Sequence, residues 1–317
     1  MSVPSGLVIV DKPGGMTSHD VVARIRRLAG TRKVGHAGTL DPMATGVLVV
    51  GVEKATRLLG YLTLTEKEYA ATIRLGQSAS TDDAEGELTP VGSAAGVYAE
   101  TLAAAVADLT GDIQQVPPAV SAIKVGGQRA YRLTRAGAAP ELKPRPVTVY
   151  EFAVTALRHD GDLLDVDATV RCSSGTYIRA LARDLGAALG TGGHLTRLRR
   201  TRVGGYGIDQ ARTLDQLADR FEVLPLAQAA SAAFPGRNLS EDEARRLAHG
   251  GRLAATGDTA AGDTAAGHTT AGDTAAGDTA GGGTGSRTPT AAFAPDGTLI
   301  ALLAEEGGQA RPLVVFA

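Results

Sequence analysis

One carboxylate in the sequence has a setting that suits chemistry: Asp41, within GHAGTLDPMATGVL (35–48). Three glycines share this stretch, and a proline directly follows the aspartate. A positioned carboxylate can act as a general base or as a nucleophile. The same letters also suit a simple turn, because Asp-Pro and glycine are common where the chain reverses direction. The residues that the fold brings to Asp41 decide between these interpretations.

Other kinds of site have weak support. The stretch lacks the GxxxxGK[ST] pattern of a phosphate-binding loop, and the chain has no GxSxG nucleophile elbow. The six histidines show no spacing typical of zinc ligands. Cys172 is the only cysteine, which excludes an internal disulfide and fits a reducing cytosol. Such a lone cysteine is best explained as a small buried apolar residue.

Charge is unevenly distributed along the chain. The formal net charge is −2, yet residues 1–240 carry 27 Lys and Arg against 24 Asp and Glu, and residues 241–317 carry 5 against 10. Residues 170–202 contain seven arginines and one acid. A basic stripe of this kind is typical of phosphate contacts with nucleic acid, with a solvated charged surface as the simpler alternative.

Five motifs, taken in order, carry a specific resemblance. They are KPGGMTS (12–18), GHAGTLDPMATGVL (35–48), EKEYAATIRLG (66–76), QVPPAVSAIKVGGQRAY (115–131) and SSGTYIRALARDLG (173–186). Together they resemble the TruB family, the bacterial tRNA pseudouridine-55 synthases, over roughly residues 5 to 210. Val120 departs from the tyrosine usual in the fourth motif, and Ala37 and Met43 replace the more usual Thr and Leu.

The resemblance implies an isomerase that converts uridine 55 in the T loop of tRNA to pseudouridine after flipping the base out. The reaction needs no redox change or hydrolysis, so no metal or organic cofactor is expected. The essential aspartate either attacks C1′ of the ribose or removes a proton from C2′ to give a glycal, and both routes stay open. The expected partner is tRNA, held at the T arm and acceptor stem, and the protein is expected to be a monomer.

The resemblance also assigns site residues. Asp41 matches the catalytic carboxylate, and Arg179 matches the arginine that pairs with it. Tyr69 matches a tyrosine that stacks on the target base and assists removal of the C5 proton. The substrate-binding positions that the resemblance implies are His36, Tyr177, Leu198, Lys12, Lys124 and Arg129. Of these, Lys12 is expected, together with Pro13, to support the site more than to perform chemistry.

The hydrophobic pattern predicts an α+β fold with a largely antiparallel sheet. Strands are expected at 7–12, 47–51, 67–76, 147–157 and 163–172, and on the third of these Tyr69, Ala71, Ile73 and Leu75 should share one face. Helices are expected after Ser18 as N-cap up to Gly30, over 101–111, and within 173–190. No regular βαβ repeat is visible, which argues against a parallel sheet.

Two domains are expected. Residues 1–234 would form the pseudouridine synthase catalytic domain, with 115–140 as a thumb-like insertion that grips RNA. Residues 235–317 would form a small β-rich PUA-like RNA-binding domain, with a helix capped by Ser240 and Glu243. Five pentamers at 256–280 almost lack large apolar residues, so 254–287 is expected to be a disordered low-complexity insertion.

Two rival functions and the location of the protein complete these expectations. A tRNA-binding folding chaperone, with catalysis secondary, is the main alternative, and a nucleotide-binding hydrolase is disfavoured because the phosphate-loop pattern is missing. The N-terminal residues lack the pattern of a signal peptide, and no apolar run reaches the roughly 20 residues of a membrane span. We therefore expect a cytoplasmic protein without a membrane partner.

Overall fold

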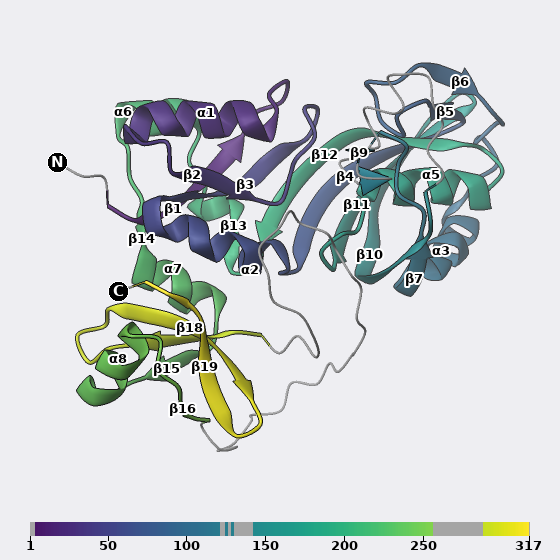
Figure 1. Cartoon of the computed structure of the whole chain (residues 1–317). Helices are drawn as coiled ribbons and strands as arrows, with labels where there is room; N and C mark the ends of the chain where they lie inside the picture. The colour runs from purple at the N-terminus through teal and green to yellow at the C-terminus, as the bar shows by residue number, and fades with distance from the viewer. Residues whose placement is uncertain (1–3, 121–123, 126–127, 130–141, 256–287, 317) are drawn as a thin grey trace.

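The chain forms one large sheet and one small sheet, each with helices packed against it (Figure 1). The computed structural model describes residues 4–120, 124–125, 128–129, 142–255 and 288–316. No helix among these residues is long and apolar enough to cross a membrane. Most of the 115–140 segment and the pentamer tract lie outside the described residues, so the expectations for both stay untested.

The large sheet is mixed but almost wholly antiparallel, as expected. Its strands run in the order β14-β1-β3-β12-β4-β11-β10-β7, with β2 beside β3 and β13 beside β12. Among the described strands of this sheet, β3 and β12 are the one pair that runs parallel. The bounds are β1 Gly6–Lys12, β2 Val34–Ala37, β3 Thr45–Val52, β4 Lys67–Leu75, β7 Gly111–Gln115, β10 Arg145–Asp160, β11 Leu163–Cys172, β12 Gly193–Val203, β13 Tyr206–Gly207 and β14 Leu224–Pro225.

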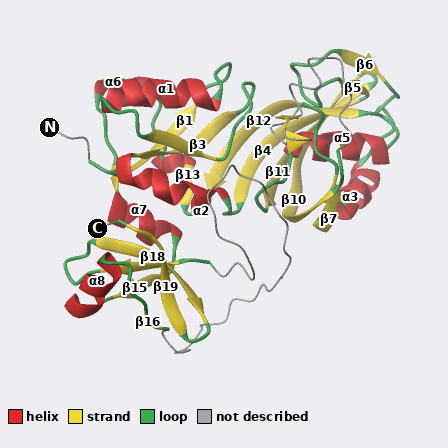
Figure 2. Ribbon diagram, in the orientation of Figure 1, coloured by secondary structure: helices red, strands yellow, loops and turns green. Residues whose placement is uncertain are grey.

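Helices cover this sheet, as the red ribbons of Figure 2 show. They are α1 Ser18–Ala29, α2 Leu59–Thr63, α3 Ala99–Asp108, α5 Ile178–Ala188 and α6 Leu214–Asp219, with 3₁₀ turns at Glu53–Leu58 and Ile208–Gln210. Two short hairpins extend from the sheet: β5 Gln77–Ala79 with β6 Leu88–Pro90, and β8 Lys124–Val125 with β9 Gln128–Arg129. On β4 the predicted alternation is confirmed, because Tyr69, Ala71, Ile73 and Leu75 are all buried in the main core.

The small sheet has the strand order β15-β17-β18-β19-β16 and lies at the C-terminal end of the chain. Its bounds are β15 Gly236–Asn238, β16 Leu253–Ala254, β17 Thr290–Phe293, β18 Leu299–Glu306 and β19 Gln309–Val315, with α8 Glu241–Ala248 packed on it. The Ser240–Glu243 capping box is confirmed. Helix α7, Leu226–Ala233, lies between the two sheets and contacts both β1 and β17.

The two sheets share one apolar cluster. Leu7 and Val49 from the large sheet lie in the same buried cluster as Leu302 and Phe316 from the C-terminal part. Two hydrogen bonds reinforce this contact: Lys54 Nζ donates to the Phe316 carbonyl at 2.6 Å, and Arg57 Nη1 donates to the Val315 carbonyl at 2.7 Å. The C-terminal sheet is therefore packed against the large one and does not hang free.

Two expectations about elements were wrong. Helix α1 begins one residue earlier than predicted, because Thr17 is the N-cap and forms the capping box with Asp20, while the Ser18 hydroxyl bonds elsewhere. The central strand β12 was not predicted at all. Its sequence GHLTRLRRTRV hides the alternation, because Arg200 occupies a fully buried position and two register shifts interrupt the pairing with β4.

Candidate active site

Asp41 lies in the loop between β2 and β3 and faces an arginine from helix α5. Arg179 Nη2 lies 3.0 Å from Asp41 Oδ2. The Arg179 side chain is only 6% exposed, whereas that of Asp41 is 37% exposed. The guanidinium is therefore buried behind the carboxylate, and the carboxylate itself remains open to a ligand from solvent.

Arg179 is held in place by groups other than Asp41. Its Nη1 lies 3.4 Å from Oδ2 of Asp83, a carboxylate that is only 3% exposed. The same guanidinium donates to the backbone carbonyls of Thr81 at 2.9 Å and Val120 at 3.0 Å. A buried guanidinium needs opposite charge and hydrogen-bond acceptors, and these contacts supply them to Nη1 and Nη2 without consuming the open face of Asp41. Its buried Nε has no hydrogen-bond partner among the described residues.

Asp83 is itself fixed by its own loop. The Thr81 hydroxyl donates to Asp83 Oδ1 at 2.5 Å, and the Glu85 amide donates to the same oxygen at 3.1 Å. The neighbouring Asp82 pairs with Arg183 instead, at 3.1 Å, and burial raises the pKa of that carboxyl. The two adjacent carboxylates therefore serve two different arginines of α5.

Two elements from the N-terminal part of the chain, α1 and β1, hold the loop that carries Asp41. The Ser18 hydroxyl donates to the Leu40 carbonyl at 3.0 Å and accepts from the Leu40 amide at 2.9 Å. The fully buried Lys12 ammonium donates to the carbonyls of Pro13, Met16 and Pro42 at 2.8, 2.6 and 3.2 Å. Burial lowers the pKa of Lys12 to about 8, and the nearby Asp41 charge opposes that shift.

Arg200 holds the same loop from β12. Its guanidinium is 1% exposed and donates to three backbone carbonyls: Val47 at 2.8 Å, Gly38 at 3.1 Å and Thr39 at 3.3 Å. Gly46 permits this approach, because a Cβ built there would lie 2.2 Å from the Arg200 carbonyl oxygen, and its φ is +99°. The backbone on both sides of Asp41 is thus fixed by a buried cation.

Tyr69 lies on β4 directly opposite Arg200 in the register with β12. Its ring is buried, and burial raises the pKa of its phenol, with the nearby Arg200 charge acting in the opposite direction and Asp41 adding to the rise. The phenol is consequently protonated near neutral pH. Leu198 lies two residues along β12, opposite Ala71, and contributes to the same buried cluster.

The other expected substrate-binding residues are distributed around this centre. His36 lies on β2, with its ring edge-on to His19 at 5.5 Å, and burial lowers its pKa. Its Nδ1 is buried and has no hydrogen-bond partner in the described part of the chain. Tyr177 precedes α5, and its backbone amide and carbonyl both bond to the buried Gln115 side chain. Lys124 and Arg129 are register partners in the β8–β9 hairpin.

The arginines of 170–202 are mostly committed to partners within the protein. The expectation that this cluster contacts phosphates is wrong for Arg179 and Arg200, whose side chains are buried. The remaining pairs are Arg171 with Glu66, Arg183 with Asp82 and Asp184, Arg199 with Asp11, and Arg202 with Glu66 and Glu68. Much of the apparent basic stripe is therefore neutralised locally.

Sequence reasoning missed three residues that build the centre: Asp83, Arg200 and Ser18. Asp83 stands in TDDAEGE, a stretch that is typical of an exposed polar loop. Arg200 stands among other arginines, and nothing local marks it as the buried one.

Cys172 is buried as expected, and burial raises the pKa of its thiol to about 11. Within the described ranges, no group of three or more His, Cys, Asp or Glu side chains could hold a metal ion.

Comparison with known protein families matches three parts of the chain. Residues 26–178 match the TruB family pseudouridylate synthase N-terminal domain. Residues 179–228 match the tRNA pseudouridylate synthase B C-terminal domain, and residues 279–317 match the tRNA pseudouridine synthase II C-terminal domain. The first boundary falls at Arg179, so the ion pair with Asp41 joins two of these matched segments.

Individual relatives agree with these matches. A protein named tRNA pseudouridine synthase B from Arthrobacter sp. (strain FB24) is 62% identical over 99% of this chain and 97% of its own length. One of the same name from Thermobifida fusca (strain YX) is 59% identical over 98% of each. Among solved structures, a Cbf5-Nop10-Gar1 complex contains a chain with 27% identity and a TM-score of 0.69, covering all of this chain and 86% of that one. The chain belongs to the TruB family of pseudouridylate synthases.

Proposed function

We propose that this protein isomerises uridine to pseudouridine in tRNA, at position 55 of the T loop, with Asp41 as the essential carboxylate. The observation that carries the proposal is the ion pair between an open Asp41 and a buried Arg179, at 3.0 Å, in a chain of the TruB family. Arg179 pairs with this carboxylate from its buried side, and the exposed side of Asp41 stays open to the ribose on which both routes act.

The reaction rearranges atoms within one nucleotide. The bond between N1 of the uracil and C1′ of the ribose breaks, the base turns, and a bond forms between C5 and C1′. The proton on C5 leaves and N1 ends with a proton, so atoms and charge balance without an added reagent. Asp41 either forms a transient bond to C1′ or takes a proton from C2′, and it is regenerated at the end.

The neighbouring side chains have roles that follow from their burial. Tyr69 offers its aromatic ring, with the phenol hydroxyl protonated, for stacking on the uracil. Leu198 offers apolar contact from the adjacent strand. His36, with a lowered pKa and an unpaired buried Nδ1, is suited to contact an RNA base without carrying charge. Tyr177 completes the pocket. Lys12 supports the loop of Asp41, because its ammonium is occupied by three carbonyls.

RNA binding is assigned to the parts that flank this centre. Lys124 and Arg129, in the thumb-like insertion, would grip the T arm, and the C-terminal part would contact the acceptor stem. This divides the chain into a catalytic domain at 1–234 and an RNA-binding domain at 235–317. We assign the activity to the cytoplasm, because its substrate is tRNA. We take the acting species to be a monomer.

The test is tritium release from a tRNA transcribed with 5-tritiated uridine. The wild-type protein should release tritium, and Asp41→Asn should release none while still binding the tRNA. A second transcript, with cytidine in place of uridine 55, should release none with either protein. Tight tRNA binding without release by the wild type would overturn the synthase assignment and favour the folding chaperone. Release from the cytidine transcript would overturn the assignment to position 55.

A further inference from the structure

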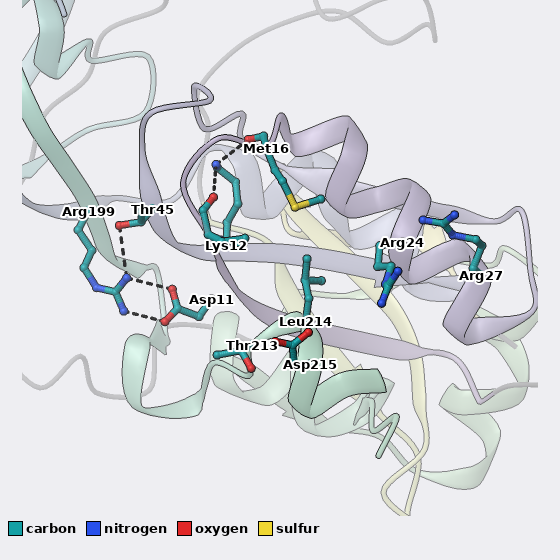
Figure 3. A pocket seen from close by; sticks show the side chains of 11 residues that line it. Asp11, Lys12, Met16, Arg24, Arg27, Thr45, Arg199, Thr213, Leu214 and Asp215 are labelled. Carbon is teal, nitrogen blue, oxygen red and sulfur yellow. Dashed lines mark hydrogen bonds and ion pairs between the residues drawn. The ribbon is translucent and has the colours of Figure 1, made fainter. Parts of the chain in front are cut away.

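A pocket of about 570 Å³ lies between α1, α6 and the end of β1 (Figure 3), and Asp41 is not among the residues that line it. Its walls come from the turn after β1, the outward side of α1, the start of α6 and Arg199 of β12. Pockets of 300–1,000 Å³ are of the size that holds small organic ligands, so this one is large enough for a nucleotide.

Two of the three arginines at this pocket have no charge partner. Arg199 is locked to Asp11 by two hydrogen bonds, of 3.0 and 2.8 Å, which neutralises that pair. Arg24 and Arg27 are exposed, and neither guanidinium has a hydrogen bond or ion pair within the described part of the chain. Figure 3 shows the bonds between Arg199 and Asp11 and none to the two arginines of α1.

The spacing of these two arginines suits one anionic group. Residues three apart on a helix lie on the same face, and both side chains line the pocket. Guanidinium groups are well suited to phosphate because their planar donors match its oxygens. The uncompensated charge of this pocket is therefore positive, because these two arginines outnumber Asp215, the lining carboxylate that remains beside the Arg199–Asp11 pair.

The rest of the lining suits a nucleoside. Met16 and Leu214 give apolar contact of the kind that a base requires. Thr213 and Asp215 offer oxygen atoms that can accept from ribose hydroxyls. A pocket for a bare phosphate would need neither feature, whereas a nucleotide would use all of them.

The pocket is connected to the candidate active site through Lys12. This residue lines the pocket, and its ammonium donates to the carbonyl of Pro42, the residue after Asp41. A polynucleotide that places one nucleotide at Asp41 can therefore reach the pocket with another. A free mononucleotide would gain nothing from this proximity, so the location favours a nucleotide that is part of the RNA substrate.

We propose that this pocket binds one nucleotide of the RNA substrate outside the catalytic pocket, with its phosphate between Arg24 and Arg27. The proposal rests on the proposed function, because it takes the substrate to be RNA. It adds a second point of attachment on the α1 side of the Asp41 loop. That contact fixes the register of the RNA strand relative to Asp41.

The experiment measures tRNA binding in the Asp41→Asn protein, so that catalysis plays no part. Adding Arg24→Ala and Arg27→Ala should raise Kd roughly 10-fold near 0.15 M salt, about threefold for each exposed arginine. The slope of log K against log salt should become shallower by about 0.9, because the two substitutions together remove one phosphate contact. Arg24→Lys with Arg27→Lys keeps the charge and should restore most of the slope.

The control is Arg32→Ala with Arg220→Ala, which removes two exposed arginines that do not line the pocket. Equal effects of the two double variants would overturn the proposal, because they would reflect net charge alone. A second outcome would also overturn the proposal: the substitutions weaken binding of uridine monophosphate but leave tRNA binding unchanged. The pocket would then bind a free nucleotide. If the wild-type protein releases tritium normally but tRNA binding does not depend on Arg24 and Arg27, this inference is overturned and the synthase assignment stands. If tRNA binding depends on both arginines but the wild type releases no tritium, the synthase assignment is overturned and the binding pocket stands.

Discussion

At the scale of single residues, the centre depends on a buried arginine shared between two carboxylates. Arg179 lies 3.0 Å from Asp41 and 3.4 Å from Asp83. We expect Asp83→Asn to reduce kcat about 10- to 100-fold with little change in KM, because Arg179 loses its buried counter-charge and shifts relative to Asp41. Tritium release under multiple turnover, together with urea unfolding, separates this catalytic loss from a loss of stability.

Asp82→Asn is the matched control for that prediction. It removes a carboxylate one residue away that pairs with Arg183, and asparagine tolerates the left-handed backbone at this position, where φ is +60°. Its effect on kcat should be small. If the two asparagine variants lose kcat equally, Asp83 has no special connection to Asp41 and the loop as a whole is responsible.

At the scale of elements, the loop of Asp41 takes its conformation from strands far away in the sequence. Arg200 of β12 bonds the carbonyls of Gly38, Thr39 and Val47. Arg200→Lys should cost about 2–4 kcal/mol of unfolding free energy, because one ammonium cannot replace a planar fork that reaches three buried carbonyls. The single-turnover rate should fall as well, measured at a temperature where urea titration shows the variant folded.

Arg202→Lys serves as the comparison for Arg200→Lys. Arg202 lies on the same strand but bonds Glu66 and Glu68 at a partly exposed position, where a lysine can keep the charge contact. Its substitution should cost less than about 1 kcal/mol and leave the single-turnover rate near that of the wild type. Indistinguishable unfolding curves and rates for the two variants would contradict the role given to Arg200.

The same elements show how far sequence reasoning reaches. The alternation of β4, the cap at Gly30 and the Ser240–Glu243 capping box were predictable, because each depends on residues close in sequence. Strand β12 was not, because its buried Arg200 reverses the rule that charged side chains face water. The Ser18–Leu40 and Arg179–Asp83 contacts join distant segments, so no local pattern could indicate them.

At the scale of the whole molecule, the shared apolar cluster couples the two sheets. Phe316 is 3% exposed in that cluster, and its carbonyl accepts from Lys54 in the 3₁₀ turn after β3. Phe316→Ala should cost about 3–5 kcal/mol. Because the cluster also contains Val49 of β3, protection against hydrogen exchange should fall in β3 as well as in β18.

Leu303→Ala is the control that distinguishes coupling between the two sheets from damage confined to the small sheet. Leu303 is fully buried in a different cluster, formed only by C-terminal residues. This variant should lower the protection of β18 amides and leave β3 amides closer to wild type than Phe316→Ala does. Unchanged β3 protection in Phe316→Ala would mean that the C-terminal sheet opens independently. In that case the tRNA contacts that we propose for the C-terminal part could not be transmitted to the Asp41 loop through this cluster.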